Sequence, residues 1–134
     1  MHIEWNDMFS IGIEELDAHH KKLIELLNKS YSLIVQENIQ SELTQLLDEL
    51  IDYAKYHFTT EEKLMQRYYY PEIDAHMVEH FSFSNKLLTY QKETKAGKKY
   101  VSIDIFDFIK HWLMEHEVKI DFEMGKFILI MQRI

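Results

Sequence analysis

Histidines and carboxylates recur at helical spacing along this chain, and their positions indicate chemistry. His57 and Glu61 stand four residues apart in the segment YAKYHFTTEEKLM, residues 53–65. Side chains at that spacing project from one face of an α-helix. The face is otherwise apolar, because Ala54 and Leu50 occupy it about one and two turns before His57. An imidazole and a carboxylate on a buried face need a compensating partner, so the segment points to a bound cation.

Three further segments repeat this pattern of ligand-type side chains on apolar helical faces. The full candidate set is His20, His57, Glu61, His76, His80, His116 and Asp121. A single pair of this kind is usually a surface contact or a satisfied hydrogen bond. A whole set on apolar faces cannot be satisfied internally, because neutral imidazoles offer acceptor nitrogens and the carboxylates bring buried charge. The pattern therefore predicts a shared metal site.

The number and type of donors select the metal. Five imidazoles and two carboxylates, with no sulfur, exceed what one tetrahedral zinc ion can use. They suit two octahedral first-row ions with both carboxylates bridging the pair. Of twelve coordination positions, the side chains fill nine and a shared oxygen bridge two, which leaves one. A redox-capable pair with one open position would bind a small ligand, and dioxygen is the natural candidate.

Composition limits the fold and the partners. The chain has 134 residues, and we expect one domain over residues 1–134. One proline and three glycines favour a few long helices over an all-β fold. The net charge of -8 argues against nucleic acid and anionic membranes as partners. The chain lacks cysteine, a long apolar run and a visible signal peptide, so we expect a cytoplasmic location and no membrane association.

Apolar periodicity predicts the elements that position the candidate ligands. Helices are expected over about 13–37 and 41–68, from 72 to the KETKAGKK segment (92–99), and from 102 onward. Residues 1–12 should form an arm that packs over helix ends, and 122–130 a short C-terminal helical piece. Ser41 and Ser102 are the expected helix caps, and Tyr31 and Met77 are expected on inward stripes.

Four such helices with short connections predict an all-α, up-down-up-down four-helix bundle. His20 lies early in the first helix and His57 late in the second. His76 lies early in the third helix, and His116 late in the fourth. Antiparallel neighbours need this alternation to bring their ligands to one level.

The spacing of the last two ligands conflicts with a regular α-helix. Asp121 follows His116 by five residues, which would place the two side chains about 140° apart. Both can reach one metal centre only if the helix unwinds, ends or forms a π-bulge between them. We predict such an irregularity.

Four motifs carry a resemblance to a known family: IGIEELDAHHKKL (11–23), HFTTEEKLM (57–65), HMVEHF (76–81) and WLMEHEVKID (112–121). They resemble those of the hemerythrin family, in particular its single-domain bacterial members, and the resemblance covers essentially the whole chain. It implies a non-haem diiron site, with an oxo or hydroxo bridge, that binds dioxygen reversibly. It also implies that Glu61 and Asp121 bridge the two irons.

The resemblance further distributes the histidines between the irons. His76, His80 and His116 would bind the coordinatively saturated iron, and His20 and His57 the iron with the open position. Such a site needs a dry pocket, and the candidates for its apolar lining are Leu23, Ile24, Trp112 and Leu113.

The remaining polar residues near these motifs are expected outside the site. His19, where the family commonly has glutamine, should be exposed because it lies about 100° round the helix from its neighbour. His111 should also be a surface residue, and His2 lies in the arm without a helical partner. Glu62 and Glu117 are expected to point away from the ligands beside them.

Storage, transport or delivery of dioxygen is the leading functional interpretation, and we do not expect an enzyme. The alternatives are an oxygen or redox sensor module and a diiron enzyme acting on peroxide or nitric oxide. The sequence lacks the Glu-x-x-His pairs of carboxylate-rich diiron oxidases. It also lacks the second histidine of the His-Glu-x-x-His motif, which excludes that class of zinc protease.

Overall fold

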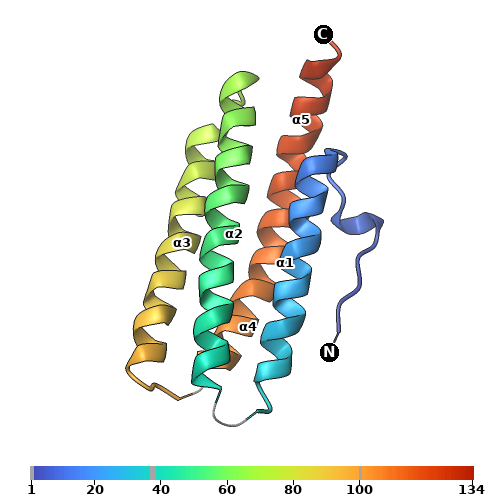
Figure 1. The fold of residues 1–134 in the computed structure, drawn as a ribbon. Coiled ribbons are helices and arrows are strands. Elements are labelled where there is room, and N and C mark those ends of the chain that lie inside the picture. Colours follow the sequence, from blue (N-terminus) through green and yellow to red (C-terminus); the bar gives the residue numbers. More distant parts are fainter. Residues whose placement is uncertain (1, 37–38, 100) are drawn as a thin grey trace.

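The computed structural model describes residues 2–36, 39–99 and 101–134. It shows four helical rods, each antiparallel to the next along the chain (Figure 1). The first three rods are α1 (Glu14–Leu33), α2 (Gln40–Arg67) and α3 (Ile73–Lys95). The fourth comprises α4 (Val101–Trp112), a π-helix (Leu113–Asp121) and α5 (Phe122–Gln132). The described residues contain no strand. The predicted all-α bundle is confirmed.

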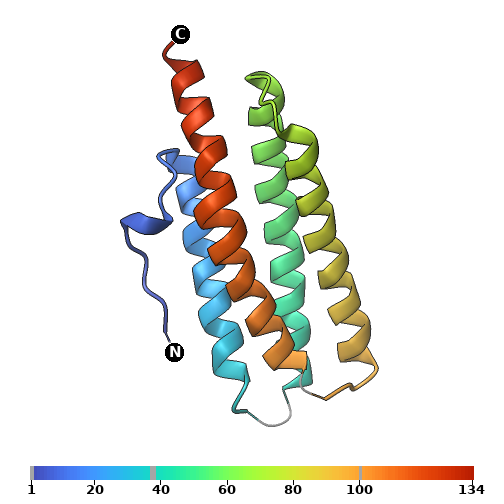
Figure 2. The same cartoon turned by 180° about the vertical axis from the view of Figure 1, so that it is seen from behind.

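The C-terminal helical piece continues the fourth rod. In Figure 2, α4 and α5 form one uninterrupted coil that runs past the ends of its neighbours. The fourth rod is therefore long enough to carry its ligands near its middle, level with the early part of α1. In the described part of the chain, no helix is both long and apolar enough to cross a lipid bilayer.

Helix ends differ from the sequence prediction. Ser41 is not a cap, because α2 begins one residue earlier, at Gln40, without a side-chain hydrogen bond at its start. Ser102 is not a cap either, since it is the second residue of α4. The first helix ends at Leu33, where its buried stripe runs out, and the predicted end at residue 37 lies outside the described residues.

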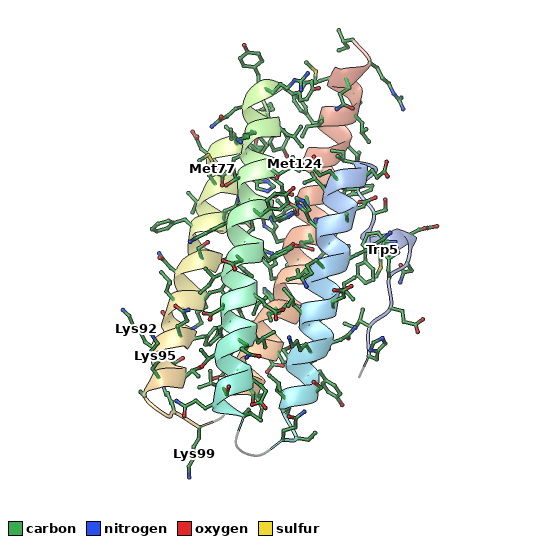
Figure 3. The ribbon with its side chains drawn as sticks, viewed as in Figure 1. Trp5, Met77, Lys92, Lys95, Lys99 and Met124 are labelled. Carbon is green, nitrogen blue, oxygen red and sulfur yellow. The ribbon has the colours of Figure 1, made fainter. Side chains whose placement is uncertain are left out.

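The inward faces are largely those that periodicity predicts. Leucines of α1 and α2 and aromatic residues of α3 and α4 form one continuous core. The prediction is wrong for two residues expected to face inward: Tyr31 is 42% exposed and Met77 is 37% exposed. Tyr31 packs at the rim against the ring of Phe106. Met77 follows the buried His76 by one residue, which turns it about 100° toward solvent (Figure 3).

The N-terminal arm lies along the outside of the first rod, where Figure 3 shows Trp5 beside α1. The side-chain amide of Asn28 makes two 2.8 Å hydrogen bonds with the backbone of Ile3. Closer to the helix start, Asp17 accepts a 2.8 Å hydrogen bond from the backbone N–H of Ile11. A side chain at Gly125 of α5 would come within 2.8 Å of the Ile11 carbonyl oxygen, so this glycine permits the arm to approach. These contacts close one side of the bundle.

Candidate metal centre

The seven predicted ligands meet in one buried layer of the bundle. Each is at most 2% exposed: His20 from α1, His57 and Glu61 from α2, His76 and His80 from α3, and His116 and Asp121 from the π-helix. The antiparallel rods bring early and late positions to the same level, as the sequence pattern requires. Their assignment as metal ligands stays a prediction, which the distances among them support.

Glu61 faces histidines on two sides. Its Oε1 lies 3.0 Å from Nε2 of His80 and 3.3 Å from Nε2 of His76. Its other oxygen, Oε2, lies 3.4 Å from Nε2 of His57. One carboxylate thus presents a different oxygen to each of two histidine groups.

Asp121 repeats this arrangement. Its Oδ1 lies 3.0 Å from Nε2 of both His76 and His116. Its Oδ2 lies 3.2 Å from Nε2 of His20 and 3.6 Å from Nε2 of His57. The two carboxylates therefore belong to both of the ligand groups whose donor atoms all lie within 4.8 Å of one another.

The π-helix explains how Asp121 joins the cluster. Its i→i+5 hydrogen bonding widens the turn, so a residue five positions after His116 returns to nearly the same face. The predicted irregularity in the fourth helix is confirmed. The wide turn also directs Leu113 and Glu117 inward, and both are buried.

Unpaired atoms show that the cluster fits a metal. Five of its buried donor atoms lack a hydrogen-bond partner among the described residues: His57 Nε2, His80 Nε2, His116 Nε2, Glu61 Oε2 and Asp121 Oδ1. Several of these histidine nitrogens lie 3.0–3.4 Å from a carboxylate oxygen without the alignment of a hydrogen bond. Ligand atoms arranged around a common cation have this geometry. Buried polar groups in such a state are costly unless they are compensated.

In the metal-free cluster, protons compensate the carboxylates. Burial by itself would lower the pKa of His20, but the carboxylates of Glu117 and Asp121 raise it to about 10. Burial would also lower the pKa of His76, but the carboxylates of Asp121 and Glu61 raise it to about 10. In return, the neighbouring imidazoles overcome the effect of burial and hold the pKa of Asp121 well below its usual value. Metal ions could replace these protons.

The outer nitrogens of two histidines are held by carboxylates. His80 Nδ1 donates to Oε2 of Glu62, and His116 Nδ1 donates to Oε1 of Glu79, each at 2.9 Å. A proton on Nδ1 leaves Nε2 free to bind a metal. The expectation that Glu62 points away is therefore wrong, and Glu79 escaped the sequence analysis because helix-to-helix contacts have no local signal.

His19 is buried rather than exposed, which corrects the sequence prediction. It is 8% exposed, and its Nδ1 lies 2.9 Å from Nδ1 of His57, so one nitrogen donates to the other. The ring also packs on Tyr56 with centroids 4.7 Å apart. His19 is buried because α2, which carries His57 and Tyr56, packs over this side of α1. His111 is exposed, as expected, and His2 in the arm is exposed as well.

Glu117 also turns toward the cluster, contrary to the prediction. It is 1% exposed, and its Oε1 accepts a 2.7 Å hydrogen bond from the hydroxyl of Tyr53. Burial raises the pKa of Glu117, and the imidazoles of His20 and His57 oppose that shift. The five-residue spacing that predicted the π-helix could have indicated this placement, because a widened turn directs consecutive residues inward.

Aromatic rings pack against the ligand histidines. Phe58 stacks on His80 with centroids 3.9 Å apart, and Trp112 stacks on His116 at 3.8 Å. The four residues expected to line a dry pocket, Leu23, Ile24, Trp112 and Leu113, are all buried in the core. Their role as pocket lining stays a prediction.

A surface pocket of about 500 Å³ lies between α1 and α2, on the side of His20 and His57. Its lining includes His19 and Tyr53, the residues that hydrogen-bond to His57 and Glu117. These two side chains therefore contact both the pocket and residues at the cluster.

Comparison with known proteins identifies the family. The model of the hemerythrin HHE cation binding domain matches residues 11–128. A bacteriohemerythrin of Clostridium acetobutylicum is 34% identical over 124 residues, which is 89% of this chain and 95% of that protein. A bacteriohemerythrin of Methylococcus capsulatus is 34% identical over 113 residues, covering 84% and 86% of the two chains.

A solved structure supports the same relationship. A crystal structure of wild-type hemerythrin superposes with a TM-score of 0.86 and 31% sequence identity, and the match covers 96% of this chain and 98% of the other. The sequence motifs, the helical arrangement and the buried cluster of histidines and carboxylates agree with these similarities. The chain therefore belongs to the hemerythrin family.

Proposed function

We propose that this protein binds dioxygen reversibly at a pair of iron ions, in storage, transport or delivery rather than as an enzyme. The observation that carries the proposal is the two-sided placement of Glu61 and Asp121. Each presents one oxygen to His76 and to a second histidine, His80 for Glu61 and His116 for Asp121, and its other oxygen to His57. Two carboxylates that face two nitrogen groups in this way are suited to bridge two ions.

The proposed ligands divide unequally between the two ions. His76, His80 and His116 would hold one ion, while His20 and His57 would hold the other, with Glu61 and Asp121 shared. The side with two histidines has fewer nitrogen donors and is the natural place for a small ligand. The iron pair would supply the two electrons that reversible binding of dioxygen requires.

The surrounding residues would exclude water and orient the ligands. Glu79 and Glu62 accept hydrogen bonds from the outer nitrogens of His116 and His80, which fixes both rings with Nε2 directed toward the cluster. Burial of the whole layer keeps solvent from the centre. Membership in the hemerythrin family, known for binding dioxygen, supports dioxygen as the ligand.

Anaerobic reconstitution tests this proposal. The protein is loaded with ferrous iron, exposed to air and then deoxygenated while its visible spectrum is recorded. We expect about two irons per chain and an absorption band that appears with air and disappears on deoxygenation. His57→Ala should abolish the band, whereas His111→Ala, which alters an exposed histidine, should leave it intact.

Other outcomes would favour the alternative functions. Rapid bleaching with stoichiometric release of peroxide would contradict reversible binding and favour an enzyme or a sensor that reports oxidation. Survival of the band in His57→Ala would show that the site for the small ligand is assigned wrongly.

A further inference from the structure

Glu117 is a buried carboxylate that the proposed ligand set does not use. One of its oxygens accepts the hydrogen bond from Tyr53, and the other, Oε2, has no hydrogen-bond partner among the described residues. A carboxylate can accept about four hydrogen bonds. A single bond leaves most of the cost of burying its charge uncompensated.

The free oxygen of Glu117 faces one side of the cluster. It lies 3.7 Å from Nε2 of His20, and Oε1 lies 3.9 Å from Nε2 of His57. Both distances are too long for hydrogen bonds. In the part of the chain that the structure describes, no lysine or arginine nitrogen lies within 4.0 Å of this carboxylate. A cation bound beside the two histidines would supply the compensating charge in the metal-loaded protein.

These distances suit a shared metal ion. Donors about 2.1 Å from one ion lie about 3.0 Å apart when adjacent and about 4.2 Å apart when opposite. The 3.7 Å between Oε2 of Glu117 and Nε2 of His20 falls between these limits. Glu117 is not a member of the tight group of His20, His57, Glu61 and Asp121, so a modest side-chain movement is needed for ligation.

Tyr53 holds Glu117 in this position. Its hydroxyl fixes Oε1 at 2.7 Å, which leaves Oε2 for the cluster. The Tyr53 ring stacks on His57 with centroids 5.2 Å apart and an interplanar angle of 14°. Tyr53 thus positions the carboxylate relative to one of the histidines with which it would share an ion.

We propose that Glu117 is a further ligand of the metal ion held by His20 and His57 and occupies the coordination position that a small ligand would take. The inference rests on the proposed metal centre but not on reversible dioxygen binding. A small molecule must displace the Glu117 oxygen in order to bind, and Tyr53 keeps the displaced carboxylate close. Exogenous anions are disfavoured further, because a buried negative charge lies beside their position.

A crystal structure of the iron-loaded, unmodified protein tests the ligation directly. We expect a Glu117 oxygen about 2.0–2.2 Å from the ion bound by His20 and His57. A separation of more than about 3 Å would overturn the proposal. This measurement needs no variant and does not depend on the response of the protein to dioxygen.

Azide titration of the diferric protein tests the functional consequence. Glu117→Gln should bind azide at least about tenfold more tightly, because the competing charged ligand is lost. The matched control is Glu115→Gln, which removes an equal charge from an exposed residue of the same helix and should match the unmodified protein. Equal azide affinity in Glu117→Gln and the unmodified protein, each with about two irons per chain, would overturn the proposal.

A double-mutant cycle tests the positioning role of Tyr53. Tyr53→Phe should shift azide affinity in the unmodified background and should have no effect in the Glu117→Gln background. An equal shift in both backgrounds, or no shift in either, would refute that role. The azide titration uses the diferric form and the dioxygen experiment the diferrous form, so either proposal can be refuted while the other stands.

Discussion

His116 Nε2 lies 3.0 Å from Asp121 Oδ1 although the two residues are five positions apart on one continuous rod. A regular α-helix would separate these side chains by about 140°. The π-helix from Leu113 to Asp121 brings them together and makes Asp121 available to both histidine groups. An uncommon local backbone conformation thus coincides with the proposed shared ligand, as π-helical turns often do at functional sites.

The shared position of Asp121 makes a prediction about metal content. Asp121→Asn should weaken both metal positions, because its carboxylate faces both groups. His20→Ala should weaken only one, since His20 belongs to a single group. Elemental analysis should find about two irons in the unmodified protein, at most one in His20→Ala, and fewer in Asp121→Asn. Equal retention of iron by the two variants would contradict the shared role.

Removal of metal should destabilise the fold. The cluster buries imidazoles and carboxylates whose unpaired atoms need a cation. Metal at about a thousand times its dissociation constant adds about 4 kcal/mol to the free energy of unfolding. For a chain of this size, the Tm should therefore rise by roughly 10 °C or more. Thermal unfolding followed by circular dichroism, before and after chelation, measures the shift, and an unchanged Tm would rule out a structural metal centre.

Metal uptake should release protons. The pKa values of His20 and His76 are raised to about 10 in the metal-free protein, so both imidazoles are protonated at pH 7. Ligation requires them neutral, and at least about two protons should leave on loading. Apparent metal affinity should therefore increase as pH rises toward 10. Calorimetric titration in buffers of different ionisation enthalpy counts the protons, and a buffer-independent heat would contradict the prediction.

The same pKa shifts predict how the metal-free protein responds to pH. A histidine whose pKa is raised on folding adds stability that is complete below its unfolded pKa of about 6.5. That stability is lost as pH rises through the folded value. Metal-free protein should become less stable between pH 7 and 10, and denaturant titrations at several pH values can follow the loss.

The hydrogen bond between His19 and His57 can be tested with a conservative replacement. His19→Ala removes the partner of His57 Nδ1, so the orientation of His57 is lost and the affinity for one metal should fall about 10–100-fold. His19→Gln keeps a side chain that can hydrogen-bond and should stay within a few-fold of the unmodified protein. Competition with a chelator of known affinity gives the comparison. Equal losses in both variants would show that His19 acts through packing alone.

The sequence alone was sufficient to identify the bundle and to select seven side chains that meet in the structure. Apolar periodicity marks the inward faces. His20 lies early in its helix and His57 late in the next, so antiparallel packing brings both to the same height in the bundle. The five-residue gap before Asp121 was also informative, because no regular helix could satisfy it. These features are local, or depend only on the antiparallel order of the rods.

The tertiary structure decided which residues surround the ligands. Glu79 and Glu62 reach their histidines across helix boundaries, and His19 is covered because α2 packs over it. Glu117 turns inward because the widened helix changes the direction of every side chain within it, including residues that α-helical periodicity assigns to solvent. The contacts of Glu79, Glu62 and His19 depend on the rotation and packing of whole helices, and for that reason no spacing in the sequence could specify them.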